Sequence, residues 1–130
     1  THCISSAASD VYKRQDEMNL LMKEFGDNPF IGYWHDFGHI QRKHNLLILN
    51  HEQFLRRMSS HLIGGHVNDV KWPARDHQVP LLGGVVPFER LLPFFPHGVP
   101  LVWELSSRVS SEDIRAARKL WMEKFPQTLA

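Results

Sequence analysis

Three short apolar runs of the sequence each end in a residue whose side chain can bind a divalent metal ion. The runs cover residues 31–36, 62–66 and 100–104, and they end in Asp36, His66 and Glu104. They lie roughly one strand-helix unit apart, and parallel strands spaced in this way can aim ligands from several strand ends at one ion. The pattern therefore predicts a metal site built from Asp36, His66 and Glu104.

Each of these residues also has a simpler structural explanation. Asp36 opens an Asp-x-Gly sequence, which is common in turns where the carboxylate caps nearby N–H groups. His66 could be a buried histidine whose ring nitrogens are both satisfied. Glu104 directly follows apolar residues, and burying its ionised carboxylate without a partner would cost several kcal/mol. Its position calls for a metal ion, a substrate donor or an arginine such as Arg108.

Further polar residues lie where they can reach the same pocket. His39 follows Asp36 by three residues, with Gly38 between them to turn the chain. The triplet Arg75, Asp76 and His77 falls in a long loop, and Arg75 offers donors to hydroxyl or phosphate oxygens. The triplet could instead be a solvated loop, and the glycines that follow it have no phosphate-binding fingerprint around them. His39, Arg75, Asp76 and His77 can therefore place polar groups around a ligand.

Composition limits the class of protein. The 130 residues are 42% hydrophobic, which suits one domain, and no apolar run approaches the ~20 residues that span a bilayer. The formal charge of +1 provides no long-range attraction for nucleic acid. The single cysteine, Cys3, excludes an internal disulfide framework and favours a reducing compartment, so we expect a cytoplasmic protein. Most of the nine histidines, including His44, His51 and His97, are expected at the surface or at helix caps.

The elements expected to position these residues alternate between strands and helices. The stripe of Met18, Leu21, Met22 and Phe25 predicts a helix, and Asn50 and Ser110 are in position to cap two more. The expected order is a helix over 18–25, a strand over 31–36, a loop and an apolar patch at 46–49, a helix after Asn50, a strand over 62–68, a long loop over 70–86, a helix from Pro87, a strand over 100–104 and a helix from Ser110 to near Pro126. Such alternation predicts a parallel sheet with ligands gathered at the carboxyl ends of its strands.

We expect three regions along the chain. Residues 1–15 are small, polar and non-periodic, resemble the spurious leader of gene fragments translated from environmental DNA, and are expected to be non-native or disordered. Residues 16–126 are expected to form the carboxyl-terminal half of a barrel domain, because a complete parallel barrel needs about 250 residues. Residues 127–130 are expected to be a tail.

Together these motifs resemble the carboxyl-terminal part of the xylose-isomerase-like TIM-barrel superfamily. The resemblance rests on residues 34–39, 65–69, 75–77 with 83–84, and 102–104, and it covers about residues 28–125. The superfamily includes sugar-phosphate isomerases and epimerases and the endonuclease IV type of repair enzyme. The implied fold is α/β, the last three strand-helix units of a (β/α)8 barrel.

The resemblance also implies a site and a reaction. In the family, Glu, Asp, His and Glu from successive strand ends hold one manganese, magnesium, cobalt or zinc ion. Asp36, His66 and Glu104 match the last three, and the first glutamate has no counterpart here. The implied activity is interconversion of a sugar or sugar phosphate by proton transfer next to a carbonyl, with Glu104 as one of the catalytic pair. The resemblance also implies that His39 contacts a substrate hydroxyl and that Arg75, Asp76 and His77 are pocket-loop residues that bind substrate.

Two alternatives stay open. A repair endonuclease of the same superfamily uses an Asp-x-His pair for its extra zinc ions, whereas Asp76 and His77 are adjacent here, and the low net charge makes nucleic acid an unlikely partner. The chain could also be an inert fragment or a metal-binding module that needs a partner. For the chain by itself we expect no turnover, and its open strand edges are expected to cause aggregation, homo-oligomerisation or loose folding.

Overall fold

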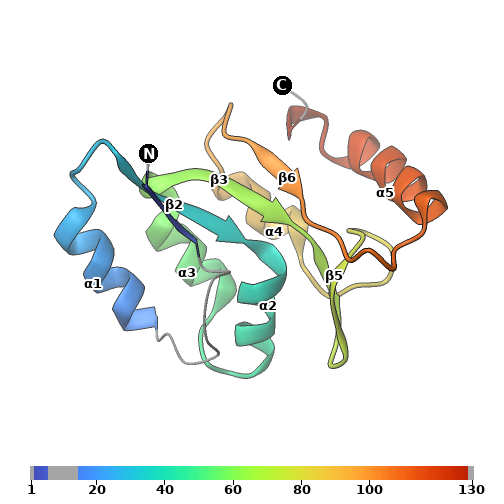
Figure 1. Ribbon diagram of the computed structural model, residues 1–130, viewed down its shortest axis with the longest axis horizontal. Helices are drawn as coiled ribbons and strands as arrows, with labels where there is room; N and C mark the ends of the chain where they lie inside the picture. The colour runs from blue at the N-terminus through green and yellow to red at the C-terminus, as the bar shows by residue number, and fades with distance from the viewer. Residues whose placement is uncertain (1, 6–14, 129–130) are drawn as a thin grey trace.

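The computed structural model describes residues 2–5 and 15–128, and its central element is a parallel sheet. The strands lie in the order β1-β2-β3-β6, and each neighbouring pair is parallel (Figure 1). Their bounds are His2–Ser5 for β1, Ile31–Asp36 for β2, Leu62–Val67 for β3 and Leu101–Trp103 for β6. The prediction of an α/β fold with a parallel sheet is confirmed, with β2, β3 and β6 where the sequence indicated strands.

Helices follow the strands along the chain. They are α1 (Gln15–Phe25), α2 (Phe37–Asn45), α3 (His51–Met58), α4 (Phe88–Leu91) and α5 (Ser111–Lys124), with short 3-10 turns at Ser59–His61, Leu92–Phe94 and Pro126–Thr128. The two predicted caps are confirmed, because the side chain of Asn50 accepts from the N–H of Gln53 and that of Ser110 from the N–H of Asp113, both at 3.0 Å. Among the described residues, no helix has the length and apolar character required to cross a bilayer.

The two faces of the sheet differ in what covers them. Side chains alternate along a strand, so Tyr33 and His35 lie on one face of β2 and Trp34 and Asp36 on the other. All five helices contribute to a single buried cluster that contains Tyr33 and, from β3, Val67. Trp34 and Val102 of the opposite face lie outside this cluster, and Val102 is 48% exposed. The candidate metal ligands are therefore on the face that the helices leave uncovered.

Two elements differ from the sequence-based expectation. Helix α2 replaces the predicted loop after residue 36. In the apolar patch that follows, Leu49 is buried in the core, whereas Leu46, Leu47 and Ile48 are exposed, with Leu47 at 92% and a backbone φ of 60°. The predicted long loop over 70–86 contains an antiparallel hairpin, β4 (Asp69–Lys71) and β5 (Arg75–Gln78). Pro87 precedes α4 as its N-cap residue and is not its first helical residue.

The chain ends bear on the predicted domain boundaries. Residues 6–14 of the predicted leader lie outside the described residues, so its non-native origin stays a prediction, although residues 2–5 pair with β2. In the predicted tail, Gln127 and Thr128 belong to the turn Pro126–Thr128. The indole Nε1 of Trp121 donates to Oγ1 of Thr128 at 2.8 Å, which ties this turn to α5, and residues 129–130 lie outside the described part.

Candidate metal centre

The carboxyl ends of three neighbouring strands bring Asp36, His66 and Glu104 together. Asp36 ends β2, His66 pairs with it in β3, and Glu104 directly follows β6. One ligand atom from each residue lies within 4.8 Å of the other two. Nδ1 of His66 is 3.0 Å from Oε2 of Glu104 and 3.7 Å from Oδ2 of Asp36. This is the convergence that a shared cation requires.

The three converging atoms are buried and have no hydrogen-bond partner among the described residues. Although Nδ1 of His66 and Oε2 of Glu104 are close, they do not satisfy each other as donor and acceptor. Buried polar atoms without partners cost free energy, and two gathered carboxylates need a compensating charge. Neighbouring ligands of an octahedral ion with bonds of about 2.1 Å lie about 3 Å apart. Carboxylate oxygens and an imidazole therefore fit a divalent ion such as manganese, magnesium, cobalt or zinc.

The structure also bears on the simpler explanations of these residues. Asp36 does cap α2, because its Oδ1 accepts from the N–H of His39 at 2.8 Å. Its Oδ2 lies 3.4 Å from Nδ1 of His39 and 3.7 Å from Nδ1 of His66, and it makes no hydrogen bond among the described residues. His66 is not a satisfied core histidine, since its Nδ1 has no hydrogen-bond partner among the residues that the structure describes. Within residues 15–128, Arg108 makes no ion pair with Glu104. Capping and metal binding thus use different oxygens of Asp36.

A second polar cluster adjoins the first. His39, Asp76 and His77 each offer a ligand atom within 4.8 Å of the other two. Nδ1 of His77 is 3.2 Å from Oδ1 of Asp76, and its Nε2 is 3.7 Å from Oε2 of Glu104. Oδ2 of Asp76 accepts from Nη1 of Arg42 at 2.5 Å. One polar network therefore runs from Arg42 through Asp76 and His77 to Glu104.

The electrostatics of this second cluster keep Asp76 ionised. Burial alone would raise the pKa of Asp76, but the hydrogen bonds and charges of His77 and Arg42 together hold that pKa below its usual value. Asp76 is thus an anion that already has two partners.

The backbone holds His77 in an unusual conformation. Its φ is 52°, in the left-handed region that few residues other than glycine adopt. Its carbonyl accepts from the N–H of Ser106 at 2.8 Å, which ties β5 to the loop after β6. Strained residues persist where the surroundings fix them, and they gather at functional sites. The placement of His77 between Asp76 and Glu104 is therefore held by the fold.

Of the four expected substrate-binding residues, three meet and one does not. His39, Asp76 and His77 form the second cluster, whereas the exposed Arg75 is not in that cluster and lines a pocket that Asp76 also lines. The sequence did not single out Arg42, and nothing in its spacing could have paired it with Asp76, 34 residues later.

Asn68 is a buried polar residue that orients the site. It is fully buried, and its Nδ2 donates to Oδ1 of Asp36 at 3.3 Å. Its position two residues after His66 on an alternating strand is the sequence signal that places it on the same face. Asp69 acts in the loop, where its carboxylate accepts from the N–H groups of Val70, Val86 and Leu81. Burial raises the pKa of Asp69, and these bonds oppose that effect.

Gly38 offers a test of the role of Asn68. A Cβ at position 38 would overlap Oδ1 of Asn68. We expect Gly38→Ala to displace the amide and weaken binding of Mn²⁺ by about 10-fold, because residues that orient metal ligands contribute 10- to 100-fold in affinity. Titration calorimetry would measure the effect.

A double-mutant cycle with Asn68→Ala separates this mechanism from a general disturbance of α2. If Gly38→Ala acts through Asn68, the double variant should bind Mn²⁺ as weakly as Asn68→Ala alone. Additive losses would contradict the mechanism.

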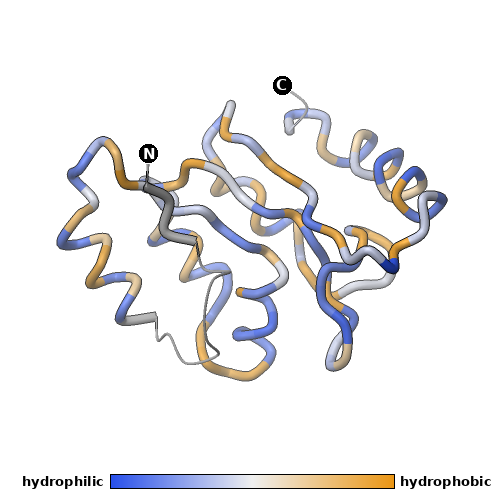
Figure 2. The backbone as a smooth tube through the Cα atoms, in the orientation of Figure 1, coloured by the Kyte–Doolittle hydropathy of each residue, from blue (hydrophilic) through white to orange (hydrophobic). Residues whose placement is uncertain are grey.

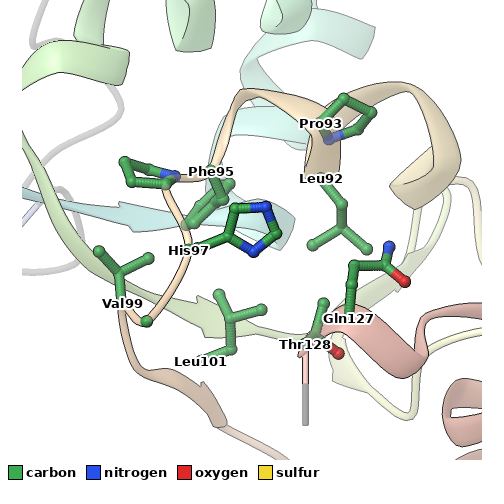
Figure 3. A pocket seen from close by; sticks show the side chains of 10 residues that line it. Leu92, Pro93, Phe95, His97, Val99, Leu101, Gln127 and Thr128 are labelled. Atoms are coloured by element: carbon green, nitrogen blue, oxygen red, sulfur yellow. The ribbon is translucent and has the colours of Figure 1, made fainter. Parts of the chain in front are cut away.

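A small cavity lies away from this centre. Figure 3 shows it at the start of β6, where Leu101, Val99, Leu92 and Phe95 line it together with His97 and the turn at Gln127 and Thr128. Its volume is about 130 Å³. Glu104 lies past the other end of the same strand. Because neither candidate cluster contributes a lining residue, this cavity is not part of the candidate metal centre.

Comparisons of the sequence with models of known protein families and with curated proteins gave no match.

Proposed function

We propose that the chain is the carboxyl-terminal half of a divalent-metal-dependent sugar isomerase or epimerase built on a TIM barrel. The observation that carries the proposal is the convergence of three buried ligand atoms, from Asp36, His66 and Glu104, that have no hydrogen-bond partner in the described part of the chain. The parallel sheet with an uncovered face supports it, because in a closed barrel that face is the interior.

The proposed mechanism assigns a task to each side chain. Asp36, His66 and Glu104 would hold the ion, with Asn68 fixing the orientation of Asp36. When bound, the ion polarises the carbonyl and hydroxyl oxygens of the sugar. The carboxylate of Glu104 removes or returns a proton at the carbon next to that carbonyl. The resemblance assigns the opposite transfer of that proton to a second glutamate, which has no counterpart in this sequence. His39 and His77, edge to face at 5.1 Å, donate to substrate hydroxyls.

The proposal can be tested on this chain without turnover. After removal of metal with a chelator, the chain should bind one Mn²⁺ at the first cluster, measured by calorimetry. Adding D-fructose should then change the relaxation of water protons by the bound Mn²⁺, because the ketose displaces coordinated water. D-Mannitol, which has the same chain length and no carbonyl, is the matched control. Equal effects of the two, or no binding of Mn²⁺, would refute the proposal.

The second cluster favours one alternative function. His39, Asp76 and His77 could hold a further ion, as in a metal-dependent phosphodiesterase of the endonuclease IV type. That function requires two or more ions per chain and binding to an oligonucleotide with an abasic site. A stoichiometry of one ion with no affinity for the oligonucleotide would exclude it, and a chain that binds no ion would be an inert fragment.

A further inference from the structure

A pocket of about 510 Å³ lies beside the second cluster. The β4–β5 hairpin forms one wall, with Lys71, Arg75 and Asp76, and the segment from Ser106 to Asp113 forms the other, with Arg108. Figure 2 colours most of this hairpin as hydrophilic. The pocket is therefore a polar hollow between two loops at the carboxyl end of the sheet.

Two of its cations face each other across the hairpin. Lys71 and Arg75 are direct partners in the antiparallel register, so their side chains leave the same face. Like charges in that arrangement repel each other. Arg108 adds a third cation from the opposite wall. Within residues 15–128, none of the three makes an ion pair.

The carboxylates of the same pocket are already engaged. Asp76 accepts from Arg42 and lies against His77, which lowers its pKa. Asp113 accepts from the hydroxyl of Ser110 at 2.8 Å, within the first turn of α5. The two carboxylates that line the pocket therefore do not pair with its three cations. The pocket suits a ligand with more than one negative charge.

The pocket adjoins the second cluster. Asp76 belongs to both, since it lines the pocket and forms the second cluster with His39 and His77. Ser106 lines the pocket and donates to the carbonyl of His77, and it lies two residues after Glu104. Asp76 and Ser106 therefore connect the pocket with His77, whose Nε2 lies 3.7 Å from Oε2 of Glu104.

We propose that this pocket binds the phosphate group of a phosphorylated sugar. The inference rests on the proposed function, because it identifies the substrate of that site as a sugar phosphate. A phosphate monoester carries close to two negative charges at pH 7, and arginine matches its oxygens with paired donors. Arg75 and Arg108 bind the oxygens, and Lys71 adds charge to the same hollow.

The first test uses inorganic phosphate and the chain freed of metal by a chelator, so that the metal centre cannot bind the anion. Phosphorus NMR titration compares the original chain with Lys71→Met/Arg75→Met/Arg108→Met. The matched control, Arg115→Met/Arg118→Met/Lys119→Met, removes three exposed cations from α5 outside the pocket. We expect the pocket variant to bind phosphate at least about 10-fold more weakly and the control to bind as the original does. Equal affinities of the two variants would overturn the inference.

The second test separates this inference from the proposed function. With Mn²⁺ bound, D-fructose 6-phosphate should bind at least about 10-fold more tightly than D-fructose, and the pocket variant should lose that preference while keeping its affinity for Mn²⁺. If the chain binds Mn²⁺ and D-fructose but does not prefer D-fructose 6-phosphate over D-fructose, only the phosphate site would be overturned. If the original chain binds no Mn²⁺ but the pocket variant still loses its affinity for inorganic phosphate, only the metal-dependent function would be overturned. A preference for a phosphodiester oligonucleotide over the sugar phosphate would overturn the assignment to a sugar phosphate.

Discussion

Replacing His66 with alanine is expected to weaken binding of Mn²⁺ by about 100-fold or more. Nδ1 of His66 lies 3.7 Å from Oδ2 of Asp36 and 3.0 Å from Oε2 of Glu104, so His66 contacts both carboxylates of the first cluster. Loss of a direct ligand should exceed the 10- to 100-fold effect of residues that only orient ligands. Calorimetric titration of the metal-free chain measures the change, and His97→Ala, in an exposed loop, is the control.

Asp36→Asn separates the two roles of Asp36. Asparagine caps helices as well as aspartate does, so α2 should keep its first turn and the free energy of unfolding without metal should change little. The amide lacks the negative charge that the ion needs, so affinity for Mn²⁺ should fall, together with the increase in Tm that the bound ion gives. The metal centre would be contradicted if the Asp36→Asn and His66→Ala variants bound Mn²⁺ as tightly as the original chain does.

The placement of these ligands was predictable because it depends on strand ends. Residues 31–36, 62–66 and 100–104 combine apolar strand formers with a terminal polar residue, and parallel strands align their carboxyl ends whatever lies between them. The caps at Asn50 and Ser110 were predictable for a similar reason, since capping is a local interaction of a side chain with an N–H three residues later. That the group binds a metal is still a prediction.

Other features depend on contacts between distant parts of the chain. Helix α2 buries few side chains, Phe37, Gly38, Ile40 and Gln41, so its sequence lacks a long apolar stripe. The β4–β5 hairpin has strands of three and four mostly polar residues, and the buried Asp69 ties its first strand to the segment that ends at Val86. Neither element has a local pattern strong enough to predict it.

The expectation that His51 lies at the surface was wrong. It is 2% exposed and contacts His35, which is fully buried. The amide nitrogen of Gln41 donates to Asn45, so the other end of this amide, Oε1, faces His51 at 2.8 Å from its Nδ1. Because Oε1 can only accept, Nδ1 of His51 must carry the proton. Nε2 of His51 then accepts from Nε2 of His35 at 3.0 Å, and Nδ1 of His35 accepts from the hydroxyl of Tyr33 at 3.1 Å. Both rings must be neutral to make these bonds.

This buried pair predicts a strong loss of stability in acid. Burial lowers the pKa of His35 from 6.5 to about 3, and burial with the charges of His35 and His44 lowers the pKa of His51 as well. Between pH 6.5 and 3 the unfolded chain therefore binds more protons than the folded chain, so stability falls as the pH falls. His35 alone accounts for roughly 5 kcal/mol across this window, and its contribution is complete above pH 6.5.

Urea unfolding at several pH values between 7 and 4 would measure this loss, and two variants identify its source. His35→Asn should be less stable at pH 7, because Tyr33 and His51 lose a partner, but its stability should change less with pH because one buried titrating group is gone. His97→Gln, in an exposed loop, should keep the steep pH dependence of the original chain. Nitrogen NMR should show His35 protonated at Nε2 and His51 at Nδ1 for as long as the chain stays folded. A folded chain whose two rings gain charge near pH 6.5 would contradict the neutral pair, and with it the bonds that join β2 to α3.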